Sequence, residues 1–193
     1  MAEPKKRLFI AVDVSPDSKR QLAEAQAKLS AVVPDAKWVE PDGLHVTLVF
    51  LGYVDETVEA SVKNALTTAA ARLSPWLFKV GGVGAFPTNS RPRVIWAGVS
   101  DGGEFASAAS ELAAVLTPLG FEPEERPYVP HITLGRIKRP HRLAEAEALT
   151  KSAKVDGASQ NAGELLLYRS RLSRSGAEYS VEARFPFGAQ AIH

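Results

Sequence analysis

The stretch that decides the fold is His45-Val46-Thr47-Leu48, because a near copy, His131-Ile132-Thr133-Leu134, stands later in the chain. The chain has four histidines, and two of them open these copies. Successive side chains of a strand point to opposite faces, so His and Thr two residues apart share one face. The apolar residues of each copy point the other way. We therefore expect two strands that each carry an imidazole and a hydroxyl on one side and a core face on the other.

The spacing of the copies also relates other parts of the chain. His131 follows His45 by 86 positions. The same offset places Arg7–Ala11 on Arg93–Ala97, and residues 77–85 on 163–171. Sequence identity outside the two copies is low, so the halves share an order of predicted secondary-structure elements more than identical residues. We interpret it as an internal duplication.

Hydrophobic periodicity and turn signals predict the remaining elements. Strands are expected near 7–14, 45–51, 77–85, 92–99, 131–137, 164–173 and 177–186, and helices near 16–32, 55–73, 103–118 and 141–151. Strands and helices mix without a repeating parallel unit, and no Pro/Gly/Ser-rich linker divides the halves. We predict a single bilobal α+β domain over residues 1–193. Two antiparallel sheets would line a central cleft, with helices on the outer faces.

Composition narrows the class of protein. The 193 residues are 45% hydrophobic and 23% charged, as in ordinary soluble globular proteins. The absence of cysteine excludes disulfides and thiolate metal sites and suits a reducing compartment. The apolar start ends at Asp13, too early for a signal peptide, and no run reaches membrane-spanning length. We expect a cytoplasmic protein, and a monomer, since nothing suggests an obligate partner.

Charge is distributed unevenly along the chain. Residues 1–125 hold 12 Lys/Arg against 16 Asp/Glu, whereas residues 126–193 hold 11 against 6. A run without acidic residues contains Arg126, Arg136, Lys138, Arg139 and Arg142. Such a run is usually a solvated surface. Because it overlaps the second His-x-Thr copy, it also fits a patch that attracts anions.

A pair of imidazoles facing one anion could divide acid and base work. An ordinary imidazole titrates near pH 6.5, so one can accept a proton while the other donates one. In-line displacement at phosphorus requires this, since one group activates water and the other protonates the departing oxygen. Thr47 and Thr133 would donate to the phosphoryl oxygens. Two alternatives stay open: half-buried strands with ordinary polar contacts, or a zinc site, which lacks a third ligand on these strands.

Several segments resemble the two-histidine (2H) phosphoesterases, specifically the RNA 2′,3′-cyclic phosphodiesterases, also called 2′-5′ RNA ligases. The segments are Arg7–Asp13, Gly43–Gly52, Arg91–Val99 and Pro130–Arg136, and residues 168–179 are similar to the closing hairpin of that family. The resemblance spans nearly the whole chain, and the doubled His-x-Thr is its most specific part. It implies a bilobal fold with pseudo-twofold symmetry.

The resemblance also implies an activity. A 2′,3′-cyclic phosphate on an RNA 3′ end or a nucleotide would be hydrolysed to a 2′-phosphomonoester, without metal or other cofactor. By the resemblance, His45 protonates the departing 3′ oxygen, His131 activates water, and Thr47 and Thr133 hold the phosphate. The same pair could instead join such an end to a 5′-hydroxyl end through a 2′-5′ bond. A non-catalytic module that binds nucleotides or RNA ends is the third possibility.

Further substrate contacts are expected from one cation and from aromatic rings. Arg136 corresponds to a family arginine near the phosphate, but strict alternation puts it on the face opposite His131. It would reach the site only if the strand bends at Gly135, and is otherwise a surface cation. Aromatic rings often stack on bases of single strands. Of the candidates Phe9, Phe50, Trp38 and Tyr128, we expect Phe9 and Tyr128 in the cleft, although most strand aromatics are core.

Overall fold

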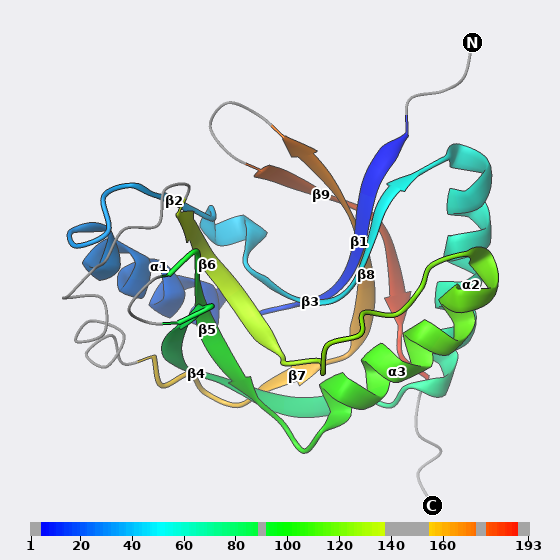
Figure 1. The fold of residues 1–193 in the computed structure, drawn as a ribbon. Coiled ribbons are helices and arrows are strands. Elements are labelled where there is room, and N and C mark those ends of the chain that lie inside the picture. The colour runs from blue at the N-terminus through cyan, green and yellow to red at the C-terminus, as the bar shows by residue number, and fades with distance from the viewer. Residues whose placement is uncertain (1–4, 89–91, 138–154, 173–176, 189–193) are drawn as a thin grey trace, which may run out of the picture.

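The computed structural model describes residues 5–88, 92–137, 155–172 and 177–188, which form the α+β fold of Figure 1. The helix expected over residues 141–151 lies outside these ranges. So do three members of the basic run, Lys138, Arg139 and Arg142.

The expected strands and helices within the described ranges are all present, with bounds displaced by a few residues. The strands are β1 (Lys6–Asp13), β2 (Ala36–Trp38), β3 (His45–Val54), β4 (Trp76–Phe86), β5 (Val94–Ser100), β6 (His131–Ile137), β7 (Gln160–Ala162), β8 (Glu164–Leu172) and β9 (Ala177–Pro186). The helices are α1 (Pro16–Ser30), α2 (Glu56–Arg72) and α3 (Glu104–Leu116), with short 3-10 turns at Pro41–Gly43 and Thr117–Leu119. The sequence did not predict β2 and β7, because a strand of three residues shows no usable periodicity.

The strands pair in the order β7-β4-β5-β6-β3-β1-β8-β9, and β2 adds to β6. Val46 of β3 pairs with Ile132 of β6, and this pair joins a half that contains β6 and β2 to a half that contains β3. The predicted class is confirmed, with one correction to its detail. The two expected sheets are halves of one continuous sheet, which curls round as Figure 1 shows.

The duplication appears in the sheet order. Counted outward from the β3–β6 junction, β3 and β6, β1 and β5, and β8 and β4 hold equivalent places. The copies nevertheless exchange elements, because β4 pairs with β5 of the second copy while β8 pairs with β1 of the first. The helices cross over as well: α1 contacts β6, and α3 contacts β3. The two copies therefore share one interior.

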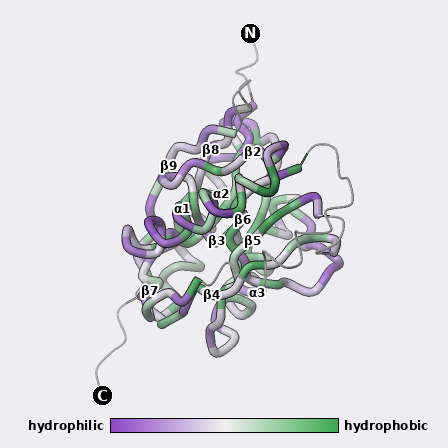
Figure 2. The backbone as a smooth tube through the Cα atoms, turned by 90° about the vertical axis from the view of Figure 1, so that its left-hand side faces the viewer, coloured by the Kyte–Doolittle hydropathy of each residue, from purple (hydrophilic) through white to green (hydrophobic). Residues whose placement is uncertain are grey.

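That interior lies between the helices and one face of the sheet. Phe105 and Leu112 of α3 and Leu22 of α1 are completely buried there, together with Ile132 and Leu134 of β6. In Figure 2 the apolar stretches of the chain run through the middle of the molecule, around β3, β5 and β6. No helix in the described residues is both long and apolar enough to cross a bilayer.

Helix α1 fixes the second half of the sheet through one buried amide. Gln26 Nε2 donates to the carbonyl oxygens of Val39 at 2.7 Å and Leu134 at 2.9 Å. The helix begins at Pro16 because Ser15 caps it, its Oγ accepting from the Ser18 N–H at 3.2 Å. The position of β6 is thus set both by its neighbours in the sheet and by the helix behind it.

Candidate active site

The site lies where β3 crosses β6. Val46 and Ile132, which pair at the crossing, are both completely buried. The residues that flank them in each strand alternate to the other face and are half-buried. These flanking residues are His45, Thr47, His131 and Thr133. The fold therefore gathers all four side chains of the doubled motif on one face of a single junction.

Both imidazoles are held by the same local bond. His45 Nδ1 lies 2.7 Å from the carbonyl oxygen of Gly43, and His131 Nδ1 lies 2.8 Å from that of Val129. A carbonyl oxygen only accepts, so each Nδ1 carries the hydrogen and donates it. Each Nε2 is left to take up or give a proton. His45 Nε2 already contacts the hydroxyl of Thr47 at 3.0 Å.

His45 sits among aromatic rings. Its centroid is 4.7 Å from that of Phe9, 5.3 Å from Tyr168 and 5.2 Å from Tyr179. Burial among these rings lowers the pKa of His45 from 6.5 to about 4, against the opposing effects of the Gly43 carbonyl and of Asp13. In the free protein at neutral pH the His45 ring is therefore uncharged.

His131 has different surroundings, although its local sequence is nearly the same. Among the described side chains, the ring that packs against His131 is that of Phe86, edge to face at a centroid distance of 5.3 Å. The Phe86 ring packs in turn against the Trp96 ring, with 5.2 Å between the two centroids. The two halves thus present one imidazole in an aromatic enclosure and one beside a single ring, which is the asymmetry that separate acid and base roles need.

Phe9 lies beside the site but not in it. Its ring is 2% exposed and stacks on Tyr168 at 5.1 Å and 7°. In the free protein little of this ring is open to a base, because the Tyr168 ring of the neighbouring strand covers it. Phe9 packs against the His45 ring in this state. Direct contact of Phe9 with substrate stays a prediction.

Tyr128 connects the two halves of the sheet. Its half-buried hydroxyl donates to the carbonyl oxygen of Thr47 at 2.8 Å. Burial raises the pKa of this phenol. The segment before β6 is thereby tied to β3 within the motif itself. Contact of Tyr128 with a bound base stays a prediction.

Arg136 comes to the face of the site through a β-bulge. In the ladder with β5, Leu134 is an extra residue between the paired Thr133 and Gly135. The extra residue shifts the alternation, so that Leu134 and Ile137 are buried while Arg136 is exposed. The expected bend is therefore present, one residue before Gly135. A role for Arg136 at the phosphate stays a prediction.

The equivalent bulge in β3 occurs at Leu48. It brings Phe50 to the place that Arg136 holds in the other half, and its ring is 55% exposed. The Phe50 and Phe9 centroids are 5.9 Å apart.

Among the described residues, no group of three His, Asp or Glu lies together in a way that could hold a metal ion.

Comparison with known proteins places the chain in a family. The model of the family described as LigT like phosphoesterase matches residues 12–96 and 99–179, and so includes both His-x-Thr motifs. The chain belongs to this family. The resemblance stated from the sequence is thereby confirmed.

Three known proteins resemble this chain over most of their length. An RNA 2′,3′-cyclic phosphodiesterase of Methanothermobacter thermautotrophicus is 33% identical over 177 residues, 91% of this chain and 96% of that protein. One from Archaeoglobus fulgidus is 40% identical over 133 residues, 69% and 73% of the two chains. The crystal structure of TT0787 of Thermus thermophilus has a TM-score of 0.80 at 30% identity, covering 95% and 99%.

Sequence reasoning missed several residues that surround the histidines of this LigT-like chain. Tyr168 and Tyr179 lie more than 120 positions from His45 in the sequence. Asp13 is close to His45 because the two residues pair in the β1–β3 ladder. Local periodicity carries no information about such contacts. The one available signal was the similarity of residues 168–179 to the closing hairpin of the family.

Proposed function

We propose that this protein hydrolyses RNA ends that carry a 2′,3′-cyclic phosphate and leaves a 2′-phosphomonoester. The observation that carries the proposal is the pair of imidazoles on one face of the β3–β6 junction, each donating from Nδ1 so that Nε2 is the reactive atom. The names of the relatives with 33% and 40% identity support the same activity.

The proposed step uses both rings. His131 Nε2 accepts a proton from water as the water oxygen attacks phosphorus. The bond from phosphorus to the 3′ oxygen breaks on the opposite side, and His45 Nε2–H gives its proton to that oxygen. Thr47 and Thr133 donate to the non-bridging oxygens, and the cation of Arg136 faces the same charge.

The acid role requires a charged His45, whereas burial keeps the ring neutral in the free protein. A bound phosphodiester brings a negative charge next to the ring and raises its pKa. Substrate binding would therefore favour the protonated form of His45, which is the form that can act as the acid.

The same proposal includes a metal-independent reaction, a monomeric protein and a cytoplasmic location.

The test is product analysis on an oligoribonucleotide ending in a 2′,3′-cyclic phosphate, in excess chelator. We expect full activity and a 2′-phosphomonoester as product. Loss of activity with chelator, or a 3′-phosphate product, would contradict the proposal. With a 5′-hydroxyl oligonucleotide also present, a longer 2′-5′ joined product in place of the hydrolysed end would favour ligation.

A further inference from the structure

A line of exposed aromatic side chains continues from the site along β3. Leu51 forms a second bulge in β3, because its neighbours Phe50 and Gly52 pair with adjacent residues of β1. This bulge keeps Phe50 and Tyr53 on the same face as Thr47. Leu51 and Val54 between and after them are buried. Phe50 is 55% exposed and Tyr53 66%. Thr47 and Tyr53 pair with Ala11 and Arg7, which are four residues apart in β1, so they lie roughly 13 Å apart at about 3.3 Å per residue.

This line is in ring contact with the catalytic histidine. Phe50 lies 5.9 Å from Phe9, which lies 4.7 Å from His45. The exposed aromatics therefore begin next to the proposed acid and lead away from it. Large apolar rings exposed in a row commonly mark a binding surface.

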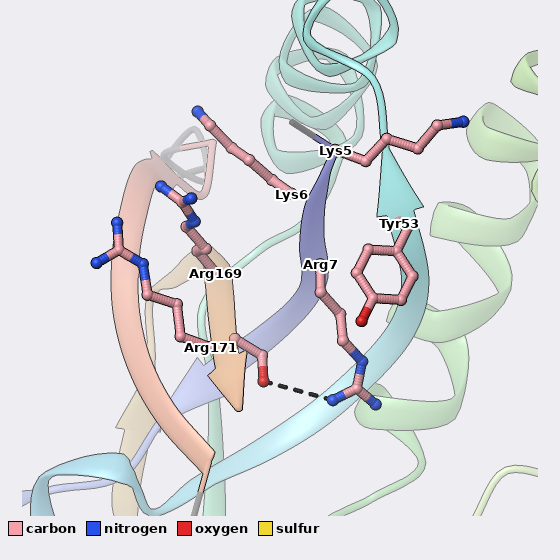
Figure 3. Close-up of a pocket in the computed structure, with 7 residues that line it drawn as sticks. Lys5, Lys6, Arg7, Tyr53, Arg169 and Arg171 are labelled. Atoms are coloured by element: carbon pink, nitrogen blue, oxygen red, sulfur yellow. Dashed lines mark hydrogen bonds between the residues drawn. The ribbon is translucent and has the colours of Figure 1, made fainter. Parts of the chain in front are cut away.

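The line ends at a basic hollow of about 440 Å³. Its lining includes Tyr53 and the basic residues Lys5, Lys6, Arg7, Arg169 and Arg171 (Figure 3). Tyr53 is the register partner of Arg7, and in Figure 3 its ring lies beside the Arg7 side chain.

The lysines and the arginines of this hollow differ in their ion pairs among the described residues. The two lysines have carboxylate partners, Asp55 for Lys5 and Glu59 and Glu182 for Lys6. Within the part of the chain that the structure describes, Arg7, Arg169 and Arg171 form no ion pair. Arg7 has one long bond, from Nη1 to Ser170 Oγ at 3.5 Å, drawn dashed in Figure 3.

We infer that the substrate is a single-stranded RNA of several nucleotides, bound along β3 from the histidines to this hollow. Exposed rings beside unpaired cations are the features that bind single strands, since rings stack on bases and cations meet phosphates. The inference rests on the proposed function, which puts the 3′ end at the histidines. The chain on the 5′ side then runs past Phe50 and Tyr53 toward Arg7.

The test compares two substrates, a 2′,3′-cyclic mononucleotide and a single-stranded oligoribonucleotide with the same end. Tyr53→Ala and Arg7→Gln should each lower kcat/KM on the oligonucleotide about tenfold, through KM, because a base stack or a phosphate contact is lost. Both should leave turnover of the mononucleotide unchanged. Arg7→Gln should also reduce the slope of log K against log salt by about 0.7.

Three controls separate this path from a general surface effect. Tyr53→Phe keeps the ring and should keep wild-type kinetics. Arg20→Gln removes an exposed arginine from α1, and Leu77→Ala removes a side chain that is 64% exposed on β4. Neither should change the ratio of the two kcat/KM values.

An unchanged ratio in Tyr53→Ala and Arg7→Gln would overturn the inference, as would equal losses on both substrates. A second copy bound at this surface would also overturn it, and would appear as a dimer in sedimentation that Tyr53→Ala abolishes. A wild-type protein that turns over neither substrate refutes the proposed function instead. Fluorescence anisotropy with a labelled oligoribonucleotide then decides the path, since both variants must still weaken binding.

Discussion

His45 and His131 show how far a residue can be predicted from its neighbours in sequence. The period of a strand correctly placed both imidazoles on the face opposite Val46 and Ile132. It could not distinguish their environments, because the rings around His45 come from β1, β8 and β9. The proposed acid and base roles therefore depend on tertiary packing that the two near-identical motifs do not encode.

The buried environment of His45 predicts its titration. In the free protein we expect the midpoint of His45 near pH 4, measured by NMR of the imidazole, and an upward shift when a nucleoside 2′-phosphate binds. A midpoint of 6.5 or above in the free protein would contradict this account.

The same pKa predicts how stability depends on pH. The unfolded chain takes up this proton below about pH 6.5, whereas the folded chain does so only near pH 4. Stability from this group is therefore complete above 6.5 and is lost as pH falls from 6.5 to 4. In urea titrations His45→Gln should lose less unfolding free energy than wild type across that window. Equal losses would contradict the assignment.

At the scale of elements, the bulges decide which residues reach the site. A seven-residue strand such as β6 shows too little periodicity to reveal one extra residue, so the sequence could state only that Arg136 needs a distortion. The structure supplies that distortion at Leu134, and supplies it again at Leu48 in β3. The two duplicated strands, β3 and β6, therefore share the bulge as well as the His-x-Thr motif.

The tie between β3 and the segment before β6 predicts a stability effect. Tyr128→Phe removes the donor to the Thr47 carbonyl and should cost about 1 kcal/mol in urea unfolding. Tyr53→Phe is the matched control, because that ring is 66% exposed, and it should cost nothing measurable. Equal effects of the two changes would show that the Tyr128 bond does not hold the junction.

The exchange of β4 and β8 between the copies shapes the whole molecule. The sequence predicted the duplication from its constant offset, but an offset does not say which strands pair. Since each half of the sheet contains strands from both copies, neither copy can complete a sheet or a core alone.

Cutting the chain between the copies tests this arrangement. Fragments 1–90 and 91–193 should each lack a cooperative thermal transition by circular dichroism, and the transition should return when they are mixed. One fragment that unfolds cooperatively alone would contradict a shared interior.

The central claim is that two imidazoles act on the same phosphorus, and a double-mutant cycle tests it most directly. His45→Ala and His131→Ala should each lower kcat on a cyclic-phosphate RNA end by about 10²–10⁴-fold, with folding checked by circular dichroism. The double variant should be about as slow as the slower single variant, because residues that act as a unit are not additive. Near wild-type turnover in either folded single variant, or losses that multiply in the double variant, would contradict it.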